Sequence, residues 1–198
     1  MLTKNKMAAI AVAGVGLMVV CSSSVAAAMM MGGDGDDDSS GGGAGSATTP
    51  KTPVVPTLPS GQYVKLVHTT LDQVINLAEL EVFTKAGTTN LATGKTVTSS
   101  AFHPAGPLPN LVDGNMTNFA HTLNEIAATG DSMLIDLGSV QEIEKIKITN
   151  RVDCCQERAI GIKVVILGAD GTTVVKETPA ITTNAATYTF TFPGTAWV

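Results

Sequence analysis

Apolar and polar positions alternate with a period of two in several segments of the second half of the chain. Tyr188, Phe190 and Phe192 fall on one side of an extended segment, whereas the threonines between them fall on the other. Lysine and isoleucine alternate in the same way over residues 145–148. This period is typical of a β-strand with one buried face, so both segments are predicted to be strands.

Further strands are expected where similar apolar runs lie between turn-forming residues. They cover residues 63–68, 74–83, 133–136, 142–149, 161–167 and 172–176, and an Asp170-Gly171 turn is expected to join the last two as a hairpin. After residue 60, no window has a sustained helical period. Many short strands with polar turns predict an all-β fold, an antiparallel β-sandwich or barrel.

The N-terminal segment follows a different pattern. Residues 7–31 contain no charged side chain, with lysines just before them and aspartates soon after. A helix of this length could cross a hydrocarbon core of about 30 Å, and the flanking charges would leave the C-terminal bulk outside. Alternatively, the apolar stretch 8–20 and the small residues after it form a cleaved signal peptide. Residues 1–31 are therefore predicted to be a membrane anchor or a signal segment.

Residues 32–60 are rich in Gly, Asp and Ser and then in Pro and Thr. Such a composition buries too little apolar surface to offset chain entropy, so a stalk is expected here. The remaining segment, 61–198, is then the folded domain. It carries nine Lys/Arg against thirteen Asp/Glu, a net charge of −4, without a basic run. Nucleic-acid binding requires clustered cations, so nucleic acid is not expected as a partner.

The densest group of reactive and charged side chains follows the strand 142–149. Arg151 and Arg158 enclose Asp153 and the adjacent pair Cys154 and Cys155. A carboxylate can hold the rigid donor fork of an arginine in place, and such an array suits neutral polyols or anions. The two cysteines are either a disulfide between sequence neighbours, which closes no chain loop, or two buried thiols.

The Arg151-x-Asp153-Cys154-Cys155-x-x-Arg158 segment resembles the signature of the F-type lectins, or fucolectins, within the discoidin or coagulation-factor type C superfamily. The resemblance implies a galactose-binding-like jelly roll that binds fucose through a histidine and two arginines, with the vicinal disulfide against the sugar's apolar face. The histidine would be His121, although 29 residues separate it from Arg151, a few more than in the family.

The resemblance extends over most of residues 61–192. Residues 90–100, 111–115 and 134–138 resemble consecutive segments of the lectin domain, whereas residues 61–82 resemble the strands that close it. Here the closing strands come first, so the domain is expected to be circularly permuted. The termini of compact domains often lie close together, and a permuted sandwich can therefore be closed equally well.

The resemblance also implies a structural calcium ion. Oxygen ligands suit calcium, and the matching positions are Glu79, Asn110, Asp113 and Asn115, with Asn118 as a further candidate. From the residues alone, Asp113-Gly114-Asn115 is simply a favourable turn.

No catalytic motif is recognisable in the sequence, and an enzyme is not expected. The first hypothesis is a surface lectin that binds fucosylated or related glycans and is tethered to a cell surface or viral envelope through residues 7–31, or is secreted after signal cleavage. The second is a structural or adhesive discoidin-like module that contacts protein or lipid, with a degenerate sugar site.

Overall fold

The computed structural model describes residues 57–99, 101–123 and 131–198, all within one compact unit formed by residues 51–198. The predicted anchor or signal segment, and nearly all of the predicted stalk, lie outside these residues. Among the described residues, no helix is both long and apolar enough to span a membrane.

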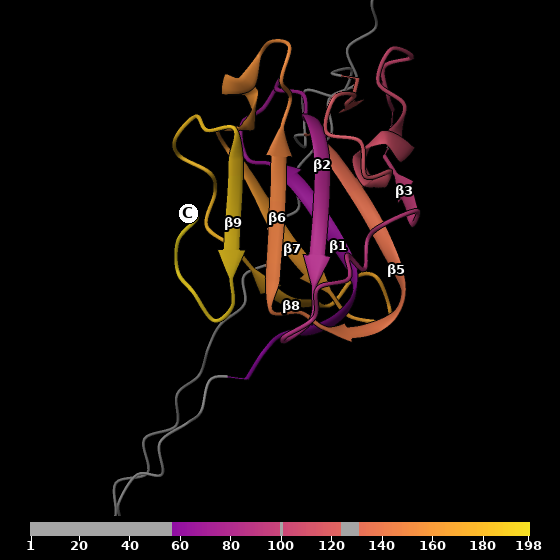
Figure 1. Ribbon diagram of the computed structural model, residues 1–198, viewed down its shortest axis with the longest axis vertical. Helices are drawn as coiled ribbons and strands as arrows, with labels where there is room; N and C mark the ends of the chain where they lie inside the picture. Colours follow the sequence, from indigo (N-terminus) through magenta and orange to yellow (C-terminus); the bar gives the residue numbers. More distant parts are fainter. Residues whose placement is uncertain (1–56, 100, 124–130) are drawn as a thin grey trace, which may run out of the picture. The chain divides into compact units, whose positions relative to one another are not determined.

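The described part of the chain is an antiparallel β-sandwich without an α-helix, which confirms the predicted fold class (Figure 1). The first sheet has the order β3-β5-β1-β7-β8 and the second the order β4-β2-β6-β9. The strands are β1 (Ser60–His68), β2 (Asn76–Phe83), β3 (Thr96–Thr98), β4 (Ala120–His121), β5 (Ser132–Glu142), β6 (Lys145–Asn150), β7 (Ile162–Leu167), β8 (Val174–Glu177) and β9 (Thr187–Thr191). Two short 3-10 helices, η1 (Leu108–Val112) and η2 (Gln156–Ala159), interrupt the connections.

Alternate residues of the strands build the core between the two sheets. Ile146 and Ile148 of β6 lie beside Phe190 and Tyr188 of β9, and all four side chains are at most 3% exposed. Burying an isoleucine or aromatic side chain of this kind contributes about 1.5–3 kcal/mol. The period-two pattern of the sequence therefore corresponds directly to the inner faces of the sandwich.

The β7–β8 hairpin forms as predicted, but its second strand begins later than residue 172. The Asp170 side chain accepts hydrogen bonds from the main-chain N–H groups of Thr172 and Thr173, at 2.9 and 2.8 Å. These bonds hold both threonines in the turn, so β8 begins only at Val174.

The start of β2 and the end of β6 lie side by side at one end of the sandwich (Figure 1). In the second sheet, the first two residues of β2 pair on opposite sides, Asn76 with His121 of β4 and Leu77 with Asn150 of β6. His121 and the connection that follows β6 therefore flank the start of β2. His68, the last residue of β1, also reaches this connection: its ring contacts Arg158, which lies 90 positions later in the sequence.

Candidate functional site

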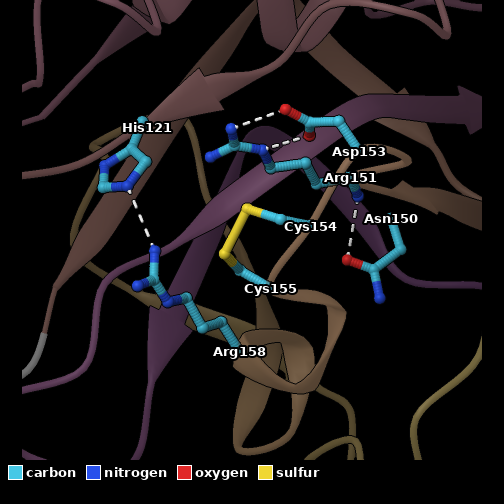
Figure 2. The surroundings of a disulfide bond; sticks show 7 residues. All are labelled: His121, Asn150, Arg151, Asp153, Cys154, Cys155 and Arg158. Atoms are coloured by element: carbon cyan, nitrogen blue, oxygen red, sulfur yellow. Dashed lines mark hydrogen bonds and ion pairs between the residues drawn. A yellow bond between two sulfur atoms is a disulfide. The ribbon is translucent and has the colours of Figure 1, made fainter.

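The candidate site is built on the connection between β6 and β7. Residues 151–158, here called the arginine loop, carry both arginines, Asp153 and the two cysteines. The pairing of β2 with β4 and β6 places His121 across the site from this loop (Figure 2). The structure thus brings all the residues predicted for sugar binding to one end of the sandwich.

Arg151 is held on two sides. Its Nη2 donates to Oδ2 of Asp153 at 2.8 Å, and its Nε donates to the other carboxylate oxygen. The guanidinium carbon also lies 3.5 Å from the ring centroid of Phe119, a cation–π arrangement. Hydrogen bonding from Arg151 lowers the pKa of Asp153 to about 2, so the ion pair persists at physiological pH.

Arg158 faces His121 from the other end of the loop (Figure 2). Its Nη1 lies 3.5 Å from Nε2 of His121, whose Nδ1 contacts the Thr122 carbonyl oxygen. A carbonyl oxygen only accepts, so Nδ1 carries the hydrogen and Nε2 presents a lone pair towards the arginine. Burial is the main cause that lowers the pKa of His121, followed by the nearby His103, Arg158 and Arg151. A neutral ring is therefore favoured.

Cys154 and Cys155 are joined by a disulfide, which lies between the two arginine side chains in Figure 2. A bond between neighbours closes no chain loop and adds almost nothing to global stability by loop entropy. Cys155 adopts a left-handed backbone conformation, with φ of 60°. The disulfide therefore acts locally: it restricts the arginine loop and places two sulfur atoms between the guanidinium groups of Arg151 and Arg158.

Asn150 fixes the start of the loop, a role that the sequence analysis did not assign. Its buried side chain donates to the carbonyl oxygens of Gln156 and Ala185, both at 2.9 Å, and accepts from the Arg151 N–H at 2.9 Å. The position of an asparagine immediately after a predicted strand was the only sequence signal for this role.

Phe119 and His103 were also missed. The ring of His103 lies 5.3 Å from that of His121, centroid to centroid. The neighbouring Gly106 accepts a hydrogen bond from the His121 N–H at 2.9 Å, and a Cβ on this glycine would lie 2.6 Å from Cβ of His121. A glycine is therefore required for the close approach that holds His121. These contacts join segments without a shared motif, so the sequence alone could not reveal them.

The residues predicted to bind calcium lie along the segment 110–118, here called the oxygen-rich turn, and on β2. Glu79 of β2 is fully buried, and its Oε2 accepts from the Gly114 N–H at 3.1 Å. The Asp113 carboxylate accepts from the Asn115 N–H at 2.8 Å and from Nδ2 of Asn118 at 2.7 Å. Asp113 and Asn115 are thus linked directly, whereas Glu79 reaches the turn through the Gly114 N–H. The Asn110 side chain donates to the Phe119 carbonyl oxygen.

This turn and the adjoining Glu79 of β2 have oxygen acceptors that form no hydrogen bond with the described residues. Oε1 of Glu79 and Oδ1 of Asn118 are buried without a hydrogen-bond partner among them. Burial is the main cause that raises the pKa of Glu79 to about 7. Hard oxygen atoms without partners suit a calcium ion. Within residues 57–99, 101–123 and 131–198, however, no three His, Cys, Asp or Glu side chains converge, so amide or main-chain oxygens would have to complete such a site.

The arginine loop and His121 together present guanidinium donors, a ring-nitrogen acceptor and a compact sulfur surface. Donors and acceptors of this kind bind hydroxyl groups, and the sulfur surface suits the apolar face of a sugar ring. The hydroxyl group of the neighbouring Thr122 is already engaged: it donates to the buried Asp131 carboxylate and accepts from the Ile75 N–H at 2.9 Å.

Comparison with known proteins agrees with this fold. Residues 110–197 match the sequence model of an F5/F8 type C family described as a NedA-like, galactose-binding domain. No curated protein and no solved structure matches the chain. The matched segment contains His121, the arginine loop and the oxygen-rich turn, but not β1 or β2. The match supports a relationship to the discoidin superfamily and a carbohydrate-binding or discoidin-like module.

Proposed function

We propose that the protein is a lectin that binds fucosylated or related glycans through His121, Arg151 and Arg158. The observation that carries this proposal is their convergence around the Cys154–Cys155 disulfide, from two segments some 30 residues apart in the sequence. The guanidinium groups donate to sugar hydroxyls, and Nε2 of His121 accepts from one. The disulfide contacts the apolar side of the ring.

The geometry supports these roles because the side chains are already oriented in the free protein. Asp153 and Phe119 hold the guanidinium of Arg151, and Asn150 holds its main chain. A site that is ordered before binding loses less conformational entropy when the ligand arrives. Specific recognition of a small neutral ligand is therefore physically reasonable here.

Calcium is part of the proposal. Glu79 and Asp113 would supply carboxylate oxygens, with oxygen atoms of Asn110, Asn115 and Asn118 completing the site. The ion would compensate the buried charge of Glu79 and hold the oxygen-rich turn against β2. Its role would be structural.

We also propose that residues 7–31 tether the domain to a membrane, with the lectin domain outside at a cell surface or viral envelope. In that arrangement the protein would mediate adhesion or recognition without catalysis. Full-length protein should then remain with membranes through alkaline carbonate extraction. Soluble protein that lacks the first residues would instead establish a cleaved signal peptide.

The decisive experiment measures binding of the full-length protein to a glycan array and to a fucosylated oligosaccharide in solution. Arg158→Ala should weaken binding about ten- to a hundredfold, because a hydrogen bond from a charged group contributes about 1.5–3 kcal/mol. Its melting temperature should change by no more than a few degrees, since Arg158 forms no ion pair among the described residues. A wild-type protein that binds no such glycan, combined with early melting of Arg158→Ala, would favour a structural or adhesive module.

A further inference from the structure

The last residue of β1, His68, packs against the arginine loop from the first sheet. Its side chain is buried, with 2% of the residue exposed. Nε2 lies 3.2 Å from the carbonyl oxygen of Arg158, and Nδ1 accepts from the Thr70 N–H at 3.1 Å. Because a carbonyl only accepts and an N–H only donates, both contacts require the neutral ring with its hydrogen on Nε2.

Other groups close the same corner around the ring. The N–H and the hydroxyl group of Thr69 both donate to the Gly161 carbonyl oxygen, at 2.9 and 2.7 Å. Gly161 has a φ of +96°, and a Cβ at this position would lie 2.9 Å from Cε1 of His68. The imidazole is therefore enclosed by the segment that carries Arg158.

We propose that His68 is a positioning residue that acts on the glycan through Arg158: its Nε2–H holds the Arg158 main chain, so that the guanidinium meets His121 and the ligand. This inference rests on the proposed lectin function. A guanidinium is separated from its main chain by four rotatable bonds, and a small change in backbone orientation displaces the donor fork by more than a hydrogen bond tolerates.

The two ends of the arginine loop are thus held by side chains from different elements. Asn150 accepts from the Arg151 N–H at the start of the loop, and the His68 ring donates to the Arg158 carbonyl oxygen at its end. Burial, the largest cause, lowers the pKa of His68, which keeps the required neutral form dominant near pH 7. The Asp131 carboxylate has a smaller opposing effect.

Two amide replacements separate the roles of the two ring nitrogens. His68→Gln can place its amide nitrogen near the position of Nε2 and retain the bond to Arg158. His68→Asn can place its amide oxygen near Nδ1 and retain only the bond from Thr70. In the full-length protein, His68→Asn should weaken binding of a fucosylated oligosaccharide about tenfold, whereas His68→Gln should remain within about threefold of wild type.

A double-mutant cycle tests whether the effect passes through Arg158. If it does, Arg158→Ala should weaken binding much less in the His68→Asn background than in wild type, because the two changes remove one shared contribution. Thr69→Val is the matched control: it removes a hydrogen bond at the same corner but not the one to Arg158. Thr69→Val should lower the melting temperature but, unlike His68→Asn, should not weaken glycan binding.

The outcomes are distinguishable. If wild type and His68→Asn bind the fucosylated oligosaccharide equally well while Arg158→Ala binds it weakly, the inference is overturned and the lectin function stands. Additive effects in the cycle, or equal losses from His68→Asn and Thr69→Val, also overturn it. A nitrogen-15 NMR spectrum that places the ring hydrogen on Nδ1 overturns it without any ligand. If wild-type protein binds no fucosylated glycan, both the function and the inference fall.

Discussion

Strand β2 contacts both the arginine loop and the oxygen-rich turn, and these two regions differ in how far the protein satisfies their polar groups. In the arginine loop, Arg151 pairs with Asp153 and Arg158 faces His121. At the oxygen-rich turn, Oδ1 of Asn118 and Oε1 of Glu79, in the adjoining strand β2, are buried and have no hydrogen-bond partner among the described residues.

This difference in hydrogen bonding suggests different partners for the two regions: a neutral ligand for the arginine loop and a cation for the oxygen-rich turn. A region whose charged and polar side chains already have hydrogen-bond partners is ordered without its ligand, so changes there should alter affinity more than stability. A buried carboxylate without a compensating charge destabilises the fold. A cation bound there would stabilise the domain, so changes in the turn should alter stability first.

The largest expected effect is the loss of calcium. Chelation should lower the free energy of unfolding by roughly 2.7 kcal/mol if the ion had stood at a hundred times its dissociation constant. Thermal melts of full-length protein with and without chelator measure this change, and Asp113→Ala should abolish it. Asp170→Ala, in a turn that also relies on an aspartate, should melt earlier and keep the chelator response. A melt insensitive to chelator would refute the metal site and leave the lectin proposal intact.

A second, smaller effect should follow from acidification. The folded-state pKa of His121 lies below its ordinary value of about 6.5. Glycan affinity should therefore be at its maximum at pH 7.5, and it should fall by up to about tenfold as the pH drops through that lowered pKa. Protonation removes the Nε2 acceptor beside Arg158. Stability should fall in the same direction, because the unfolded chain takes up the proton first.

Isothermal titration between pH 7.5 and pH 5 measures this effect with an uncharged glycan. His121→Gln should bind more weakly because it lacks the Nε2 acceptor. Since a glutamine amide is not protonated in this range, the variant should also lose most of the pH dependence. An affinity that is constant with pH in wild type would contradict the acceptor role of His121.

Reduction of the Cys154–Cys155 disulfide should have a smaller effect, again on affinity. The bond restricts only its own loop, and ordering a freed segment on binding costs about 0.5–1.5 kcal/mol per immobilised side chain, equivalent to a loss of several-fold. The melting temperature should hardly change. Parallel binding and melting measurements in reductant test this, with a Cys154→Ala/Cys155→Ala protein as control. A large drop in melting temperature would show that the disulfide supports the fold itself.

The smallest expected effect concerns the Arg151–Asp153 pair. The Asp153 side chain is 56% exposed, and exposed ion pairs contribute little to stability. Asp153→Asn should weaken glycan binding by less than about fivefold, because Phe119 still supports the guanidinium, and should leave the melting temperature unchanged. Glu177→Gln, which breaks the similarly exposed pair with Lys163, is the matched control and should leave binding unaffected. Early melting of Asp153→Asn would show that the pair is structural.

Much of the fold was predictable because alternation in sequence becomes alternation in burial. Ile146, Ile148 and Phe190 were assigned to a buried strand face from their spacing alone, and they lie in the core. Strand ends were less predictable. The start of β8 depends on hydrogen bonds from Thr172 and Thr173 to the Asp170 side chain, and a periodic pattern does not encode them.

The sequence by itself determined the all-β class and the local group of Arg151, Asp153, Cys154, Cys155 and Arg158, because neighbours along a chain remain neighbours in a loop. Tertiary structure alone decided which distant residues support that loop. Phe119 lies beneath Arg151, and His68 reaches the Arg158 carbonyl across 90 residues. Such contacts depend on strand register and sheet order, which sequence spacing does not specify.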